Sequence, residues 1–292
     1  MFTIRQAERR QAKLRLALTG VSGSGKSLGA INLASGMGKK FVVIDTEHRS
    51  ADLYAHIAKY DVLTLDKPFT PEKYIQAINY CESQGYEIII VDSLSHAWAG
   101  EGGVLDMHDA ATQASARKNS WTAWKDVAPW QNKLINTVIQ SPAHIILTLR
   151  VKTHYDVVDV DGKKKPIKIG LSPIQKEGLE YEFTCVLSMD KDSYLYTSSK
   201  DRTGMFEGRH EKLSQETGKK IMEWLESGKS IAESNSEEIA ALREQMIQCA
   251  TIESLREIFR SAREKYPAEA ESFLKIADDR SKLLKATGDM VS

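Results

Sequence analysis

The residues best able to do chemistry form the run Gly20-Val-Ser-Gly-Ser-Gly-Lys26-Ser27, which matches G-x-x-x-x-G-K-[ST] at every fixed position. In this motif the glycines let the backbone curl, so that successive N–H groups face the phosphates of a nucleotide. Lys26 is expected to reach the β- and γ-phosphates, and the Ser27 hydroxyl to ligate Mg²⁺. ATP and Mg²⁺ are therefore the predicted cofactors, and the predicted phosphate-binding set is Gly20, Ser22, Gly23, Ser24, Gly25, Lys26 and Ser27.

Two acidic residues stand where apolar runs end. The run Glu87–Asp92 ends in a carboxylate, and Asp92 is predicted to hold Mg²⁺ together with Ser27. Glu47 follows a second apolar run and is predicted to orient and deprotonate an attacking water, which favours a hydrolase over a kinase. Each acid has an alternative interpretation, because Asp92 could cap the following turn and Glu47 could be a solvated loop acid.

The elements that must position these residues alternate between short apolar runs and helical patterns over residues 13–150. This alternation predicts an α/β fold with a mainly parallel sheet and crossover helices. The expected strands are Leu14–Leu18, Phe41–Asp45, Val62–Leu65, Glu87–Asp92 and His144–Leu149, and the expected helices are Lys26–Gly36, Pro71–Ser83 and Val127–Gln140.

The pattern changes after Arg150. Residues 157–169 predict a β-hairpin that turns at Asp161-Gly162, a favoured turn dipeptide. Two late strands, Tyr181–Met189 and Ser193–Thr197, and a helix near Leu213–Leu225 follow. We expect a core over residues 1–226, a linker rich in Ser, Gly and Glu over 227–237, and a small helical appendage over 238–292.

Composition narrows the class of protein. Lys+Arg and Asp+Glu both total 40, so any surface that binds nucleic acid must be local. Cys81, Cys185 and Cys249 match no metal-ligand spacing and are interpreted as reduced thiols. No apolar run approaches the roughly 20 residues of a membrane helix, and the N-terminus lacks a hydrophobic signal core. These features predict a cytoplasmic protein with no membrane partner.

With these motifs in place, the chain resembles the RecA-like recombinase superfamily over roughly residues 13–210. Ile44-Asp-Thr-Glu47-His48 is similar to the strand end that carries that family's catalytic glutamate. Ile88–Ser93 resembles its Mg²⁺-binding strand, and His144–Arg150 resembles the strand that senses the γ-phosphate. The likeness is strongest to the minimal phage-encoded proteins of single-strand annealing and recombination. The family commonly carries Gln at the sensing position, where this chain has Arg150.

The resemblance also implies a homo-oligomer with ATP at the subunit interfaces. Lys200 and Arg202, at K-x-R spacing, are similar to the family's paired cations that reach a neighbouring subunit's ATP. Alternate residues of an extended segment point the same way, so both cations could face one phosphate. A solvated surface turn is the alternative. The expected catalytic residues are thus Lys26, Glu47, Arg150, Lys200 and Arg202.

Two predicted loops resemble the DNA-binding loops of the family. Ala99–Ser120 follows the Mg²⁺-binding strand, and Val151–Ser172 follows the sensing strand. Ammonium groups track phosphates while rings stack on bases, although a lysine-rich turn is often only a solubilising one. Trp121 and Trp124, at helical spacing, are predicted to pack in the core or at an interface. The expected DNA-binding residues are Arg117, Lys118, Lys152, His154, Tyr155, Lys163, Lys164, Lys165 and Lys168.

The sequence therefore predicts an oligomeric, DNA-stimulated ATPase that binds single-stranded DNA in phage recombination or annealing, where a single-strand-binding protein is a further expected partner. Two alternatives stay open at this point. One is a hexameric helicase-like motor, and the other is a regulatory P-loop ATPase that binds a protein partner and no DNA.

Overall fold

The computed structural model describes residues 6–115, 119–160 and 163–288. The chain divides into two compact units. The larger unit is Ala12–Leu225, and the smaller one combines Met1–Gln11 with Glu226–Ser292. The N-terminal residues thus belong with the C-terminal helices, whereas the sequence predicted one core from residue 1 to residue 226.

The larger unit contains a mixed sheet with the order β3-β2-β4-β5-β1-β7-β8, and β6 pairs with β5 alone. All neighbours from β3 to β7 run parallel, whereas β7–β8 and β5–β6 are antiparallel. The predicted α/β fold class, with a mainly parallel central sheet, late antiparallel strands and C-terminal helices, is confirmed. The strands are β1 (Arg15–Gly20), β2 (Phe41–Asp45), β3 (Asp61–Thr64), β4 (Ile88–Asp92), β5 (His144–Val160), β6 (Lys163–Pro173), β7 (Cys185–Met189) and β8 (Tyr196–Asp201).

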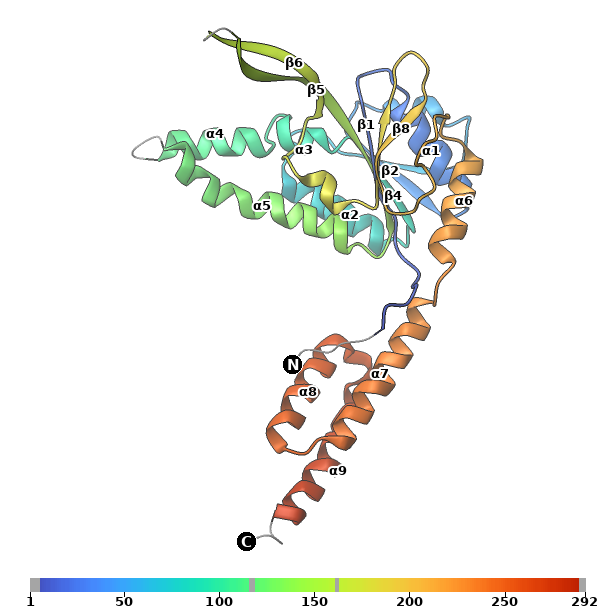
Figure 1. Cartoon of the computed structure of the whole chain (residues 1–292), viewed down its shortest axis with the longest axis vertical. Coiled ribbons are helices and arrows are strands. Elements are labelled where there is room, and N and C mark those ends of the chain that lie inside the picture. Colours follow the sequence, from blue (N-terminus) through green and yellow to red (C-terminus); the bar gives the residue numbers. More distant parts are fainter. Residues whose placement is uncertain (1–5, 116–118, 161–162, 289–292) are drawn as a thin grey trace. The chain divides into compact units, whose positions relative to one another are not determined.

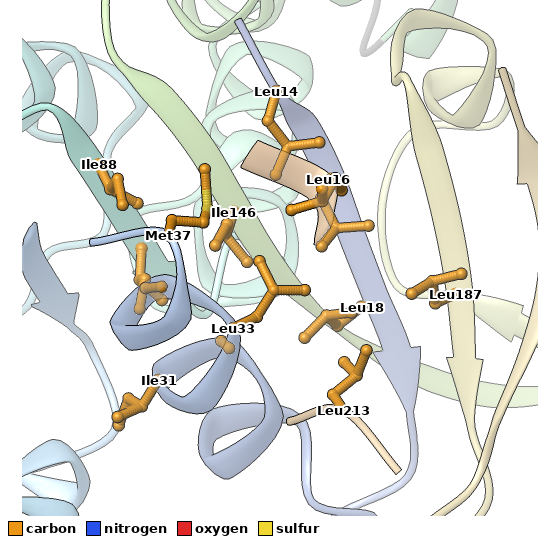
Figure 2. Packing of buried hydrophobic residues seen from close by; sticks show 14 of the residues in the cluster. Leu14, Leu16, Leu18, Ile31, Leu33, Met37, Ile88, Ile146, Leu187 and Leu213 are labelled. Atoms are coloured by element: carbon orange, nitrogen blue, oxygen red, sulfur yellow. The ribbon is translucent and has the colours of Figure 1, made fainter. Parts of the chain in front are cut away.

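Helices cover both faces of this sheet (Figure 1). One face packs against α1 (Lys26–Gly36), and Figure 2 shows Leu33 of this helix and Met37, the residue after its end, lying near strand residues such as Leu16 and Ile146. The other face packs against α2 (Pro71–Ser83) and α5 (Ser120–Gln140). Every residue of β1, β2 and β4 is buried, which explains the apolar runs at their centres. Each fully buried leucine or isoleucine stabilises the sheet by about 1.5–3 kcal/mol.

Local hydrogen bonds set where the covering helices begin and end. Thr70 caps α2 by accepting from the Lys73 N–H at 3.3 Å, with Pro71 in the first turn. The C-terminal end of α5 is held by the buried guanidinium of Arg15, which donates to the Ile139 carbonyl oxygen at 3.0 and 3.1 Å. Burial lowers the pKa of Arg15 to about 10, so it remains a cation that suits a helix C-terminus.

A helical arm replaces the loop expected over Ala99–Ser120. Helix α3 (Ser95–Ala99) ends where this segment begins, the segment itself contains α4 (Val104–Ala114), and α5 begins at Ser120 rather than at Val127. Helices α4 and α5 lie side by side in Figure 1. Only Val104 and His108 of α4 are buried, which is less than the apolar stripe by which a helix is predicted from sequence. The rings of His108 in α4 and Trp124 in α5 stack with their centroids 4.2 Å apart and join the two helices.

The predicted hairpin is present and is longer than expected. Strand β5 continues past the sheet, and β6 pairs with it from Val151↔Pro173 to Val160↔Lys163. The resulting ribbon extends away from the remaining strands (Figure 1). The expected turn at Asp161-Gly162 lies outside the described residues.

The smaller unit is built from α7 (Ile231–Gln248), α8 (Ile252–Lys265) and α9 (Ala270–Gly288) around a core that includes Phe273. The predicted linker over 227–237 needs correction, because α7 already begins within it. Ser230 and Glu233 form a capping box, so the Ser and Glu composition that suggested a linker instead starts a helix. Within the described residues, no helix combines the length and the apolar character that a membrane span requires.

A buried imidazole gives the larger unit a pH-dependent stability. His144 is 3% exposed, and its Nδ1 accepts a hydrogen bond from the Leu14 N–H at 3.0 Å. Burial, followed by the nearby charges of Lys13, Arg15 and Lys39, lowers the pKa of His144 to about 3. The unfolded chain therefore binds a proton at this residue, near its ordinary pKa of about 6.5, at pH values where the folded chain does not.

We predict that His144 lowers the free energy of unfolding as the pH falls from about 6.5 towards 3, by up to about 1.4 kcal/mol per pH unit. Urea denaturation of the wild type and of His144→Asn over this range measures the effect. The Asn variant keeps a side-chain acceptor without the titration, so its stability should fall less steeply. Equal slopes for the two proteins would contradict the prediction.

Candidate active site

The phosphate-binding motif forms the turn between β1 and α1, as its strand–loop–helix context requires. Gly23 and Gly25 adopt φ values of +79° and +82°, which favour glycine because it has no Cβ. Gly20 is needed for a different reason, since a Cβ there would lie 2.9 Å from the Met189 carbonyl oxygen. Lys26 is buried, and its Nζ donates to the Gly20 carbonyl oxygen at 2.9 Å. The ammonium group thus lies inside the loop that would surround the phosphates.

Asp92 ends β4 and is buried in the middle of the sheet edge. Its carboxylate accepts hydrogen bonds from the hydroxyls of Ser27 and Thr148, both at 2.5 Å. Burial raises the pKa of Asp92, with smaller contributions from Glu47 and Asp45, while the two hydroxyl hydrogen bonds act in the opposite direction. Ser27 and Asp92 therefore lie together, as predicted, and supply the oxygen donors that Mg²⁺ prefers.

Glu47 follows β2, the strand next to β4. The buried carboxylate of Asp45 organises this turn by accepting from the N–H groups of Glu47 at 2.6 Å and Ala51 at 3.0 Å. His48 and Arg49 are both left-handed, with φ values of 56° and 66°. Non-glycine residues in this conformation are uncommon and concentrate at functional sites. The turn thus aims the Glu47 carboxylate at the same sheet edge as Asp92.

Arg150 and His96 lie on either side of the Glu47 carboxylate. The Arg150 guanidinium binds both carboxylate oxygens, through Nε at 2.9 Å to Oε1 and through Nη2 to Oε2. His96 Nε2 lies 3.9 Å from Glu47 Oε1, and its Nδ1 is 2.8 Å from the hydroxyl of Thr46. Burial and the Arg150 charge lower the pKa of His96, so its imidazole is neutral at pH 7. Glu47 is therefore paired with a cation in this structure.

These groups form one electrostatic unit. Burial lowers the pKa of Lys26, and the Arg150 charge adds to this, whereas Asp92 and Glu47 act to raise it. Two cations and two carboxylates thus share one sheet edge beside the open phosphate loop. A triphosphate can be bound here by backbone N–H groups and Lys26, with an acid available for its terminal phosphate.

Comparison with known proteins identifies the family. A family model described as "AAA domain" matches residues 12–232. The chain belongs to this AAA domain family. The family therefore makes the chain a P-loop ATPase, as its phosphate-binding motif predicted. The chain is also similar to the solved structure titled "Crystal structure of the RadB recombinase", with 16% identity, a TM-score of 0.37, and coverage of 71% of this chain and 90% of that one. No curated protein matches the chain.

Several site residues of this AAA domain were missed by sequence reasoning. Thr148 is a fully buried polar residue within the apolar run His144–Leu149, and that contrast was the available signal. Thr46 is also buried, and its hydroxyl accepts from the Ser93 N–H at 2.8 Å and donates to the Asp92 carbonyl oxygen at 3.1 Å. These two hydroxyls fix β2 and β5 to the end of β4, and neither matches a local motif.

A second missed feature joins the hairpin to the site. The Arg150 N–H donates to the Ser95 hydroxyl at 2.9 Å, and the Ile174 N–H donates to the Arg150 carbonyl oxygen at 2.7 Å. The next residue, Gln175, is buried and donates to the Leu94 carbonyl oxygen at 3.4 Å. Both ends of the β5–β6 ribbon are thus attached to the turn that follows Asp92. Only the fold makes this arrangement visible.

Lys200 and Arg202 lie together but far from the phosphate loop of their own chain. Lys200 is within β8 rather than after it, and both side chains donate to the Tyr181 carbonyl oxygen, at 2.6 and 3.2 Å. The strand register places these cations beside the start of β1. Asp201, which lies between them on the chain, pairs with Cys185 of β7, and Cys185 pairs with Leu16 of β1. The phosphate loop follows the opposite end of β1, so these cations do not reach it within one chain.

The predicted DNA-binding residues that the structure describes all lie on β5 and β6. Lys152 is exposed at the root of the ribbon. His154, Tyr155, Lys163, Lys164, Lys165 and Lys168 lie on the paired strands β5 and β6, and Arg117 and Lys118 lie outside the described residues.

The two tryptophans of the arm have different environments. Trp124 packs as predicted, with its ring centroid 6.0 Å from that of Trp98. Trp121 is 87% exposed, so of its two predicted environments the core is excluded and packing at a subunit interface stays a prediction. It lies in the first turn of α5.

Proposed function

We propose that this AAA domain protein hydrolyses ATP with Mg²⁺ and uses the nucleotide to control binding of single-stranded DNA, as a homo-oligomer with ATP at its subunit interfaces. Recombination or annealing of phage DNA is the setting that its sequence resemblance favours. The observation that carries the proposal is Arg150, which pairs with Glu47 at the hydrolytic site and begins the lysine-rich β5–β6 ribbon. Arg150 thereby links Glu47, the acid proposed for ATP hydrolysis, to the ribbon proposed to bind DNA.

The chain's own residues account for hydrolysis in a simple sequence. Lys26 and the backbone N–H groups of the loop hold the phosphates, and Ser27 with Asp92 would hold Mg²⁺, which neutralises charge on the β- and γ-phosphates. Glu47 accepts a proton from the attacking water. It can do so only after it is released from Arg150, and the more highly charged γ-phosphate competes for that guanidinium.

Movement of Arg150 would change the position of the ribbon directly. Arg150 is bound through its backbone to Ser95 and Ile174, and Gln175 extends the junction to Leu94. A shift of the guanidinium from Glu47 to a phosphate therefore acts at the point where both strands of the ribbon meet the sheet. Presence of the γ-phosphate would favour one orientation of the ribbon, and hydrolysis would release it.

The ribbon has the composition that single-stranded DNA requires. It contains Lys163, Lys164, Lys165 and Lys168, together with Tyr155 as a ring on which a base could stack. Contacts of this kind release counterions from the phosphates, so binding weakens steeply as salt increases.

We predict that single-stranded DNA raises the ATPase rate of the wild type and that the increase fades with rising salt. The triple variant Lys163→Ala/Lys164→Ala/Lys165→Ala should bind DNA more weakly, and the slope of log K against log salt should fall in magnitude by about 2, at about 0.7 per lysine. Its ATPase rate without DNA should be unchanged.

A charge-matched control removes three exposed lysines elsewhere, Lys59, Lys219 and Lys275, and should keep the wild-type slope. If DNA neither stimulates the wild type nor binds to it at low salt, the DNA-binding role is lost. A regulatory ATPase with a protein partner would then be the better account.

The paired cations Lys200 and Arg202 support the oligomeric part of the proposal. They converge on one point, yet their own phosphate loop lies at the other end of β1. A second copy of the chain could present its ATP to them, and a cation at the γ-phosphate accelerates hydrolysis by about 10³–10⁵.

Complementation tests this assignment. We predict that Lys26→Ala and Lys200→Ala/Arg202→Ala are each inactive alone, because one lacks the phosphate-binding ammonium and the other lacks the cations supplied to a neighbour. Mixed one to one, they should recover roughly a quarter of the wild-type ATPase rate, since one interface in four combines both intact halves. Turnover by the double variant alone, or no recovery on mixing, would refute the transfer of these cations between subunits.

A further inference from the structure

The turn between β7 and β8, residues 190–195, packs on the outer side of the phosphate loop. At one end of the turn, a Cβ on Gly20 would lie 2.9 Å from the carbonyl oxygen of Met189. At the other end, a Cβ on Gly25 would lie 3.2 Å from Cδ1 of Tyr194. The turn is thus in close contact with the loop on both sides of its own first residues.

Lys191, in this turn, reaches the middle of the loop. A Cβ on Gly23 would lie 3.9 Å from Cε of Lys191, and among the described residues no other heavy atom beyond the chain neighbours of Gly23 comes within 4 Å. Both residues are exposed. Within the described parts of the chain, the Lys191 ammonium makes no ion pair or side-chain hydrogen bond. Its charge is therefore available to an anion bound in the loop.

Asp190 holds the turn in one conformation. Its carboxylate accepts hydrogen bonds from the N–H groups of Asp192 at 3.2 Å and Ser193 at 2.8 Å, and from the Ser193 hydroxyl at 2.6 Å. Its carbonyl oxygen accepts from the N–H of Tyr194 at 3.1 Å. Because the backbone on both sides of Lys191 is fixed, binding of an anion would restrict only the lysine side chain, which keeps the entropic cost small.

Lys26 approaches the same loop from within. It is buried, and its Nζ donates to the carbonyl oxygens of Gly20 at 2.9 Å and Val21 at 2.8 Å. Lys191 instead approaches Gly23 from the solvent side. A triphosphate held by the N–H groups of the loop would therefore have one ammonium group within the loop and another on its outer side. Each could donate a charge-assisted hydrogen bond to a phosphate oxygen.

We propose that Lys191 is a second phosphate-binding cation of the nucleotide site, and that the chain supplies it to its own ATP. The inference rests on the proposed function in one respect, that the loop binds a triphosphate. Lys191 differs from Lys200 and Arg202, which need a neighbouring copy, because it reaches the loop of its own chain. A monomer therefore makes this contact, and its contribution to affinity is independent of protein concentration.

Equilibrium binding of ATP and of inorganic tripolyphosphate to the full chain tests the inference. Lys191→Ala should weaken the binding of both ligands about tenfold, which corresponds to the loss of one hydrogen bond between charged groups. The two losses should be equal, because the lysine contacts phosphate oxygens and not the base. Lys191→Arg should keep most of the wild-type affinity, since a guanidinium also binds phosphate.

Lys212→Ala is the matched control, because it removes the same charge near the same loop. Lys212 precedes α6 (Gln215–Glu226), and its Nζ lies 5.6 Å from the ring centroid of Tyr194, which contacts Gly25 rather than Gly23. Salt screens an exposed charge that does not touch the ligand, so this variant should bind tripolyphosphate within about twofold of the wild type. Equal losses in Lys191→Ala and Lys212→Ala would overturn the inference, because they would show a diffuse attraction and no specific contact.

A second measurement follows Lys191 in the wild type, where no variant can fail to fold. Trace acetylation, read by mass spectrometry, should slow at Lys191 when tripolyphosphate is bound and stay unchanged at Lys219, an exposed lysine of α6. Unchanged labelling of Lys191, or wild-type affinity in Lys191→Ala, would overturn the inference while the nucleotide site stands. A wild type that binds neither ATP nor tripolyphosphate would remove the proposed function itself, and this inference with it.

Discussion

The buried carboxylate of Asp92 is the constraint on which the site depends. Removing a carboxylate from water costs several kcal/mol unless hydrogen bonds or opposite charges compensate for it. In this protein the hydroxyls of Ser27, from the phosphate loop, and Thr148, from β5, each donate a hydrogen bond to the Asp92 carboxylate. The same contacts that make the burial tolerable also fix the loop and the neighbouring strand relative to β4. Asp92, the phosphate loop and the strand that carries Arg150 are thus positioned together.

From that centre, short polar contacts lead outward to the surface. Thr46 attaches β2 to the end of β4, and the turn after β2 presents Glu47 to Arg150. Arg150 is bound in turn to Ser95 and continues into the β5–β6 ribbon. Thr46 and Glu47 follow the end of β2, Ser95 begins the helix after β4, and Arg150 lies on β5 where it passes the same edge of the sheet. Chemistry and a remote surface can therefore share one residue.

The sequence predicted those site residues whose positions follow from local patterns. The phosphate loop follows from glycine and lysine spacing, and Asp92 and Glu47 follow from carboxylates at the ends of apolar strands. Thr148 could not be assigned, because its partner is 56 residues away in the chain. Helix α4 escaped prediction since a tertiary stack on His108 replaces an apolar stripe. The start of α7 was interpreted as a linker because capping residues share a linker's composition.

Calorimetric titration of ATP, with and without Mg²⁺, into the wild type and Asp92→Asn tests the central claim most directly. The Asn side chain keeps the shape of Asp92 and removes its charge. We expect Mg²⁺ to strengthen ATP binding to the wild type about tenfold or more, and Asp92→Asn to lose this gain while still binding metal-free ATP through the loop and Lys26. An equal Mg²⁺-dependent gain in the two proteins would contradict the assignment of Asp92 as the acid around which the site is built.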